Sequence, residues 1–265
     1  MRHPVGTFCF AELHTPAPEL SAGFYRDLFG WSVRQISDGY WMFWSGTSVV
    51  VGMRRADTHK WIACVRVDNV ERAIARAQTL EMTVVTPAVE TPGVAHAAML
   101  RDREGAVIGL WEPRGVEGTA LETGPGSFWW VELATAAMGP AQRRYASLFD
   151  WGITHTMKFD NGPHGYTLFK VGERSAGGAF QFEPEWGVIP AWQVYFEVTN
   201  FDASVARACS LGGAQGFWRD APNAGRIGVI FDPGGGLFLI AQPLAPASPQ
   251  PLRHAGSASY GASRG

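Results

Sequence analysis

The chain has 265 residues, of which 46% are hydrophobic and 17% are charged, and its formal net charge is −2. Without an excess of Lys and Arg it cannot neutralise many phosphates, so no nucleic-acid partner is expected. Its longest apolar runs are far too short to span a bilayer, so no membrane partner is expected either.

The N-terminus and the cysteines bear on the compartment. Met1–Pro4 opens with Arg and His and lacks the apolar stretch of a signal peptide. Cys9, Cys64 and Cys209 are an odd, scattered set without the spacing of a metal site. We therefore expect reduced, buried thiols in a cytoplasmic protein.

The predicted elements begin with a strand over Thr7–His14, followed by a helix that has Leu20, Phe24 and Leu28 on one face and ends at Gly30. Three short strands follow, at Ser32–Ile36, Tyr40–Ser45 and Ser48–Met53. The same order then recurs, with a strand at Trp61–Val67, a helix at Asn69–Leu80 and three strands that end at Ala106–Glu112. Each unit is a βαβββ module.

The second half of the chain repeats the first. Gly6–Val33 aligns without a gap with Gly126–Ile153, and Pro140 suits the first turn of the second helix. The pairs include Glu12 with Glu132, Tyr25 with Tyr145 and Trp31 with Trp151, and Trp61–Leu80 matches Trp192–Leu211. The repeat predicts two domains, 1–113 and 126–243, joined by a linker, 114–125. Residues 244–265 are rich in Pro, Ser, Ala and Gly, which predicts a disordered tail.

Three motifs carry a family resemblance. The run Phe24–Trp31 resembles the helix end "FYxxLFGW" of the vicinal oxygen chelate superfamily, which includes glyoxalase I, bleomycin-resistance proteins and extradiol dioxygenases. Val65–Val70 resembles its strand-to-helix entry, and Asp102–Gly105 and Asp232–Gly235 resemble its "DPxG" turn. The resemblance implies an α+β fold in which four βαβββ modules form two tandem domains. One fold hosts many activities, so function must be argued from the site.

The two-domain form, with Glu-Leu near the end of the first strand of each half, is similar to actinobacterial proteins often labelled glyoxalase-like. Such labels are common near antibiotic biosynthesis, and the resemblance therefore implies a place in secondary metabolism.

Metal-dependent members of this superfamily hold a divalent ion with His, Glu or Gln side chains. By register those positions correspond to Phe10, Ile62 and Gly109 in the first half and to Trp130, Gln193 and Leu239 in the second. Only Gln193 could coordinate an ion, which predicts no bound metal and no other cofactor. A register slip would bring in Glu12, His14, Glu112 and Glu132, so a metal-dependent glyoxalase or dioxygenase remains an alternative.

Glu12, His14 and Glu132 are the candidate catalytic residues. By alternation each glutamate shares a face with aromatic residues, Phe8 and Phe10 or Phe128 and Trp130. Burial there would raise the pKa of a carboxyl group toward that of a general base. His14 lies two residues from Glu12 and faces Ala134 in the repeat, so it could complete an acid–base pair. The alternative is a structural carboxylate.

The aromatic residues form the second constellation. The chain has 11 Trp and 16 Phe, which suits a pocket for a flat or apolar ligand, although core packing accounts for most of them. The candidate ligand-binding residues are Phe10, Tyr40, Trp41, Trp44, Trp130, Tyr166, Trp192, Gln193 and Tyr195.

The sequence thus favours a metal-independent protein, monomer or homodimer, that binds an aromatic or polyketide-like small molecule. We expect an isomerase, cyclase or lyase-type tailoring enzyme that works by proton transfer. A drug-sequestering resistance protein would need the same pocket and no titrating group.

Overall fold

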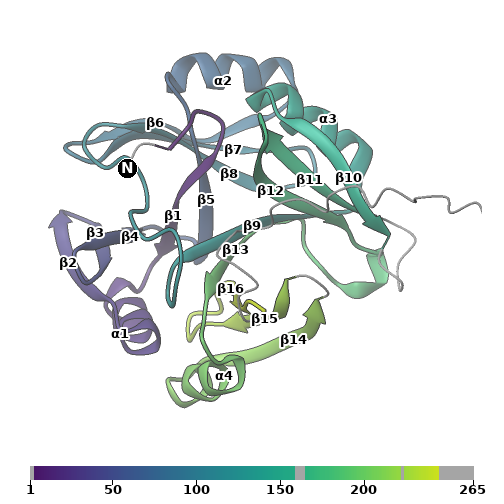
Figure 1. Cartoon of the computed structure of the whole chain (residues 1–265). Coiled ribbons are helices and arrows are strands. Elements are labelled where there is room, and N and C mark those ends of the chain that lie inside the picture. Colours follow the sequence, from purple (N-terminus) through teal and green to yellow (C-terminus); the bar gives the residue numbers. More distant parts are fainter. Residues whose placement is uncertain (1–2, 159–164, 222–223, 245–265) are drawn as a thin grey trace, which may run out of the picture.

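A computed structural model describes residues 3–158, 165–221 and 224–244. From residue 245 on, the predicted tail lies outside these ranges. The described part folds as two curled, eight-stranded sheets with the helices at the periphery (Figure 1).

The first sheet and its helices come from the first half of the chain. Their order is β1 (Phe8–Thr15), α1 (Pro18–Phe29), β2 (Ser32–Ser37), β3 (Tyr40–Ser45), β4 (Ser48–Arg55), β5 (Lys60–Arg66), α2 (Val70–Thr79), β6 (Thr83–Thr91), β7 (Ala95–Arg101) and β8 (Val107–Pro113). The strand order in the sheet is β2-β3-β4-β1-β5-β8-β7-β6.

The second sheet repeats this plan. Its elements are β9 (Phe128–Thr135), α3 (Met138–Phe149), β10 (Gly152–Lys158), β11 (Gly165–Val171), β12 (Arg174–Gln181), the short 3-10 helix η1 (Pro184–Trp186), β13 (Ala191–Glu197), α4 (Phe201–Ser210), β14 (Ala214–Ala221), β15 (Gly225–Phe231) and β16 (Leu237–Gln242). The order β10-β11-β12-β9-β13-β16-β15-β14 matches that of the first sheet. The predicted α+β fold of four βαβββ modules is confirmed.

Helix α1 shows why these residues form a helix and which face they bury. Pro18 occupies its first turn, and Gly30 ends it with a left-handed φ of 72° that few residues other than Gly adopt. The buried face contains Ser21, Phe24 and Tyr25, whereas Leu20 is 52% exposed. Of the expected face, Phe24 is buried and Leu28 packs against the core, so the expectation is wrong for Leu20. In α3, Pro140 lies in the first turn, as predicted.

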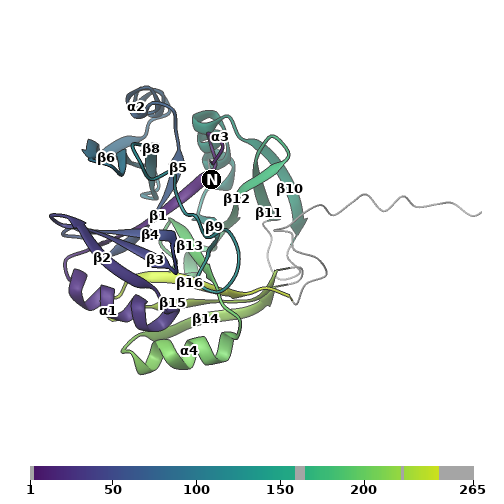
Figure 2. The same cartoon turned by 60° about the vertical axis from the view of Figure 1, so that its left-hand side comes forward.

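Residues of the helix motif in each domain form hydrogen bonds with the "DPxG" turn of the other domain. Tyr25 of α1 donates a hydrogen bond of 2.7 Å to Asp232 in the turn before β16, and Tyr145 of α3 donates one of 2.9 Å to Asp102 in the turn before β8. As a result α1 lies beside α4 and α2 beside α3, which both views show (Figures 1 and 2). The sequence signals of the family are thus contacts between the halves.

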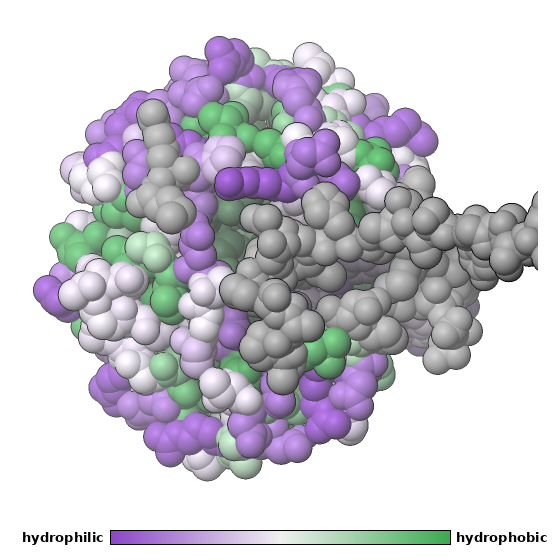
Figure 3. All heavy atoms as spheres, in the orientation of Figure 1, coloured by the Kyte–Doolittle hydropathy of each residue, from purple (hydrophilic) through white to green (hydrophobic). Residues whose placement is uncertain are grey.

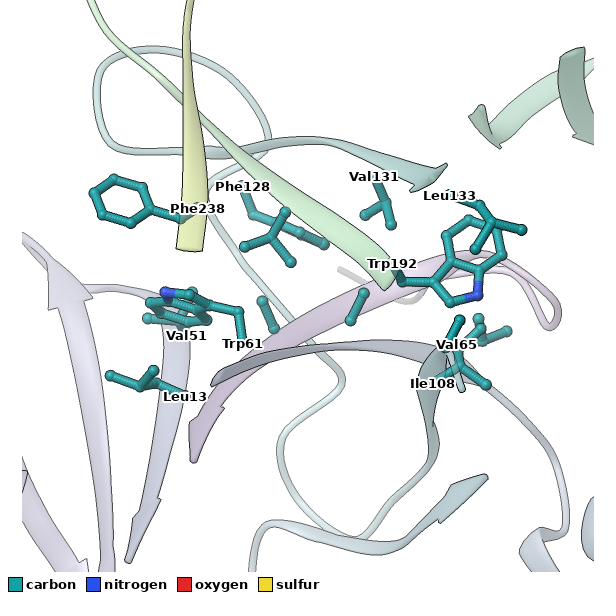
Figure 4. Packing of buried hydrophobic residues seen from close by; sticks show 14 of the residues in the cluster. Leu13, Val51, Trp61, Val65, Ile108, Phe128, Val131, Leu133, Trp192 and Phe238 are labelled. Carbon is teal, nitrogen blue, oxygen red and sulfur yellow. The ribbon is translucent and has the colours of Figure 1, made fainter. Parts of the chain in front are cut away.

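The main core lies between the two sheets (Figure 4). Trp61 on β5 packs against Phe196 of the second domain, with ring centroids 5.1 Å apart. Trp192, its equivalent on β13, packs against Phe8 of the first domain at 5.0 Å. Each domain therefore contributes this indole to the core that both domains share, beside those of Trp31 and Trp151.

The cysteines only partly follow expectation. Cys9 and Cys64 are free and buried, but Cys209 on α4 is exposed, because its position in the helix faces away from the sheets. None of the helices in the described ranges is long and apolar enough to cross a membrane. On the face drawn in Figure 3, apolar side chains form several separate groups between hydrophilic ones.

Candidate functional site

Each sheet has two faces. One face packs on the core that the two domains share. The other face, which points away from this core, is called the inner face of that sheet. Strand alternation sends Phe10, Glu12 and His14 to the inner face of the first sheet, whereas Ala11 and Leu13 enter the core. A bulge between Phe8 and Phe10 breaks the alternation and turns Phe8 into the core. Its equivalent Phe128 also lies in the core, so the expected face shared by Phe8 and Glu12 is wrong.

The first inner face is largely closed to solvent. Six of its residues are at most 3% exposed: Phe10, Tyr40, Met42, Ile62, Cys64 and Trp111. The linker contributes to this closure. Val116 packs against these residues and accepts a hydrogen bond from the indole of Trp111, and Thr119 donates its backbone N–H to Cys9. The linker is thus a cover for the first sheet as well as a connection.

Glu12 on this face is a paired carboxylate. It is 4% exposed, accepts a 2.8 Å hydrogen bond from Arg54 on β4, and lies 3.6 Å from Nε2 of His14. Burial alone would raise the pKa of Glu12, but the nearby His14 side chain and the charge and hydrogen bond of Arg54 bring it below its ordinary value. The expected rise is therefore wrong for Glu12, which is held ionised.

Arg54 also connects distant strands of the first sheet. Its guanidinium donates to the Thr91 hydroxyl on β6 and lies 4.7 Å over the Tyr40 ring. Because β4 and β6 are separated in the strand order, the bond ties together two parts of the curled sheet. Arg54 therefore has a structural role, and its pairing with Glu12 explains why that carboxylate can be buried in its charged form.

Glu132 is the same residue in a different environment. It is 6% exposed and accepts hydrogen bonds from Tyr195, at 2.9 Å, and from Tyr166. Burial raises the pKa of Glu132, and these two bonds and the charge of Arg219 on β14 offset that rise only in part. A carboxyl group whose pKa is raised toward neutrality can both accept and return a proton.

The repeat explains the contrast between the two glutamates. Glu12 pairs in register with Gly52 and Glu132 with Gly178, so Arg54 is equivalent to Phe180 and His14 to Ala134. The second domain thus has neither the arginine nor the histidine that lies beside Glu12. Sequence comparison found the change at His14, but it missed Arg54, Thr91 and Arg219, which lie on strands where the repeat aligns more loosely.

Two tyrosines occupy matching places with different partners. The Tyr166 hydroxyl lies over Gly178, where it leaves no room for a Cβ atom, and it accepts a 2.9 Å hydrogen bond from the Trp130 indole. The hydroxyl of Tyr40 lies over Gly52 in the same way, but it has no hydrogen-bond partner in the described structure. The residue equivalent to Trp130 in the first domain is Phe10, whose side chain has no hydrogen-bond donor for the Tyr40 hydroxyl. Only the second domain completes this network.

The second inner face is also more accessible. Trp130, Tyr166 and Gln193 are half-buried, whereas their equivalents Phe10, Tyr40 and Ile62 are buried. Gln193 lies directly opposite Glu132 in the register of β13 and β9. Tyr195 is buried among Leu239, Ala241 and Ile227 and directs its hydroxyl to Glu132.

Two of the predicted ligand-binding residues belong to the core. Trp192 lies between Phe8 and Tyr145, and Trp41 packs on the core side of β3, beneath Arg55. The expectation that they line a pocket is wrong, because alternation along each strand sends them to the face opposite Tyr40 and Gln193. Trp44 lies on the first inner face, half-buried.

The donors on the inner faces do not fit the divalent metal of the superfamily. The expected positions carry Phe10, Ile62 and Gly109, or Trp130, Gln193 and Leu239, and the charge of Arg54 opposes a cation beside Glu12. Glu112 lies on the core side of β8, where it accepts the backbone N–H of Val70 and pairs with Arg114. In the described ranges, Glu71, His96 and Glu112 are the one group of three close His, Cys, Asp or Glu side chains.

The opposite pKa directions of the two glutamates predict opposite effects of pH on stability. The ordinary value is 4.5 for both. The raised pKa of Glu132 gives a contribution that is complete below this value and is lost as pH rises through the folded-state pKa. The lowered pKa of Glu12 gives a contribution that is present above 4.5 and is lost as pH falls through its folded-state pKa.

Urea unfolding across a pH series measures this contrast. From acid to neutral pH, Glu132→Gln should gain stability relative to the wild type, whereas Glu12→Gln should lose it. The same sign of change for both variants would contradict the environments described here.

Comparisons with known proteins agree with the architecture. No family model matches the chain. It is 28% identical over 266 residues to the anthracycline biosynthesis protein DnrV of Streptomyces peucetius, covering 91% of this chain and 94% of that protein. It is 27% identical over 251 residues to CFP32 of Mycobacterium tuberculosis, which is named as a glyoxylase, covering 90% and 95% of the two chains.

Solved structures show the same fold. The Mn(II)-bound glyoxalase from Novosphingobium aromaticivorans superimposes with a TM-score of 0.64 and 13% identity, covering 89% of this chain and 81% of that one. Homoprotocatechuate 2,3-dioxygenase from Brevibacterium fuscum, in complex with 3,4-dihydroxyphenylacetate, gives 0.63 and 16%, covering 93% and 83%. At these identities the likeness establishes the fold and leaves the chemistry to the residues of the site.

Proposed function

We propose that this chain, whose two tandem domains have the vicinal oxygen chelate fold, binds an aromatic small molecule on the inner face of its second domain and transfers a proton of that molecule with Glu132. The observation that carries the proposal is the environment of Glu132, a buried carboxyl group whose hydrogen bonds in the described part of the chain come from two tyrosines and not from a cationic side chain. The names of the relatives, a glyoxylase and anthracycline biosynthesis proteins, support a role in secondary metabolism.

Glu132 has the properties that such chemistry needs. Its raised pKa favours proton uptake from carbon or oxygen, and the hydroxyls of Tyr166 and Tyr195 hold the carboxyl group in one orientation. Trp130 fixes Tyr166 in turn, because its N–H occupies a lone pair of the phenol oxygen and leaves the phenol O–H for Glu132. Trp130 and Tyr166 also offer half-buried rings against which a flat ligand can pack.

The proposed chemistry needs no metal, because proton removal next to a carbonyl group is completed by the carboxylate and by hydrogen-bond donors. The first domain would serve as a scaffold, since Glu12 is neutralised by Arg54 and its inner face is covered by the linker.

The indole N–H signals of tryptophan test which domain binds the ligand. Aromatic ketones and phenols are added to ¹⁵N-labelled protein, and the signals of Trp130 and Trp111 are assigned with Trp130→Phe and Trp111→Phe. We expect the Trp130 signal to shift and the Trp111 signal to stay, because Trp130 is half-buried whereas Trp111 is 1% exposed. A shift of Trp111 alone would place the ligand in the first domain and overturn the proposal.

Turnover separates an enzyme from a sequestering protein. Binding that shifts the Trp130 signal without any catalysed proton exchange would support sequestration.

A further inference from the structure

The glutamines of the second domain differ in what their amides do. The side-chain oxygen of Gln181 accepts the backbone N–H of Met138 at the start of α3, and that of Gln242 accepts the N–H of Phe201 at the start of α4. These two amides satisfy helix N-termini, which leave backbone donors without partners. Gln193 makes no such bond: within the described ranges its amide has no hydrogen-bond partner.

The position of Gln193 in β13 places its amide on the inner face of the second sheet. Trp192 and Val194 point into the shared core, so strand alternation sends Gln193 to the inner face. There it lies opposite Glu132 on the neighbouring strand. Directly paired residues of antiparallel strands have Cβ atoms about 5 Å apart, so a small group can contact both side chains.

The repeat shows that the amide is not required by the fold. The equivalent of Gln193 is Ile62, which is 1% exposed and packs in the closed first inner face beside Phe10 and Cys64. An isoleucine therefore suits this place in the sheet. The half-buried amide of Gln193 is therefore not needed to hold the sheet together, and it is accessible to a ligand on the inner face.

We propose that Gln193 binds a ketone or phenol oxygen of the ligand, so that the substrates of the second domain are aromatic compounds with an oxygen on or next to the ring. This inference rests on the proposed function. The amide N–H donates to the ligand oxygen, and Glu132 lies beside the adjacent C–H bond. Gln193 is thus a specificity-determining residue.

The step conserves atoms and electrons. The Glu132 carboxylate removes a proton from the carbon next to the carbonyl group, and the electron pair of that C–H bond forms a C=C bond. The carbonyl π electrons move to the oxygen, which accepts the N–H of Gln193. The proton then returns from Glu132 to carbon, so no oxidant, reductant or co-reactant is consumed.

A pair of probes measures the contribution of the oxygen. 1-Tetralone and tetralin share one ring skeleton, and only the former has a ketone. We expect the wild type to bind 1-tetralone more tightly in equilibrium dialysis. Gln193→Ile, which introduces the residue of the first domain, should reduce that preference by roughly 3- to 10-fold, as for one hydrogen bond. Affinity for tetralin should hold or rise.

The matched control is Ile62→Gln, which adds an amide to the closed face and should leave the preference unchanged. An unchanged preference in Gln193→Ile, with both probes still bound, would overturn the role of Gln193 and leave the proposed function standing. Failure of the wild type to bind either probe would overturn both. If Gln193→Ile unfolds, Gln193→Met, of similar length and without the amide, gives the same comparison.

Discussion

Glu132→Gln should lower the rate of catalysed proton exchange by about 10²- to 10⁴-fold, the usual contribution of a general base. The amide keeps the size of the carboxyl group and can still accept from Tyr166 and Tyr195, but it cannot take up a proton. The measurement is deuterium incorporation next to the carbonyl group of 1-tetralone in D₂O, followed by NMR. Affinity for the probe should change little, because Glu132 lies beside the bound oxygen rather than on it.

Glu12→Gln is the matched control. Glu12 holds the same place in the first domain but is paired with Arg54 and covered, so its amide variant should exchange protons at the wild-type rate. Equal losses in both variants would indicate a structural effect. Full activity in Glu132→Gln would remove Glu132 from the mechanism.

Trp192→Ala should reduce the free energy of unfolding by about 3–5 kcal/mol, as expected for a large aromatic side chain removed from a packed core. The indole is 3% exposed and contacts Phe8 of the other domain and Tyr145 of α3, the tyrosine that binds Asp102. Its loss therefore affects both the packing within the second domain and the contact between domains.

Denaturant unfolding measures this effect, with Trp186→Ala as the control. Trp186 is 55% exposed on η1, so its removal should change stability by less than about 0.5 kcal/mol. In the folded Trp192→Ala variant, the Trp130 indole signal should still shift with ligand. If Trp192→Ala is as stable as the wild type but no longer binds the ligand, Trp192 lines the ligand-binding site and does not belong to the core.

The order of elements and the tandem repeat could be predicted from the sequence, because both depend on local patterns. Hydrophobic periodicity identified strands and helices, and the repeated motifs identified two copies of one fold. Glu12 and Glu132 could be singled out as well, since a carboxylate on an apolar strand face is unusual whatever its neighbours are. The division into residues 1–113 and 126–243 and the catalytic roles stay predictions.

Which face a residue occupies was decided by the tertiary structure. The bulge between Phe8 and Phe10 shifts the alternation, and Trp41 and Trp192 entered the list of ligand-binding residues only because aromatic residues were counted without regard to face. A single extra residue in a strand reverses the side on which every later side chain lies.

The difference between the two glutamates also needed the folded chain. Arg54 and Tyr195 are far from Glu12 and Glu132 in sequence and meet them only because strand pairing brings them to one sheet face. A pKa depends on burial and on charges within a few ångströms, and neither is a local property of the sequence. The sequence by itself therefore determined the fold and the two candidate carboxylates, and the tertiary structure distinguished the neutralised one from the one suited to proton transfer.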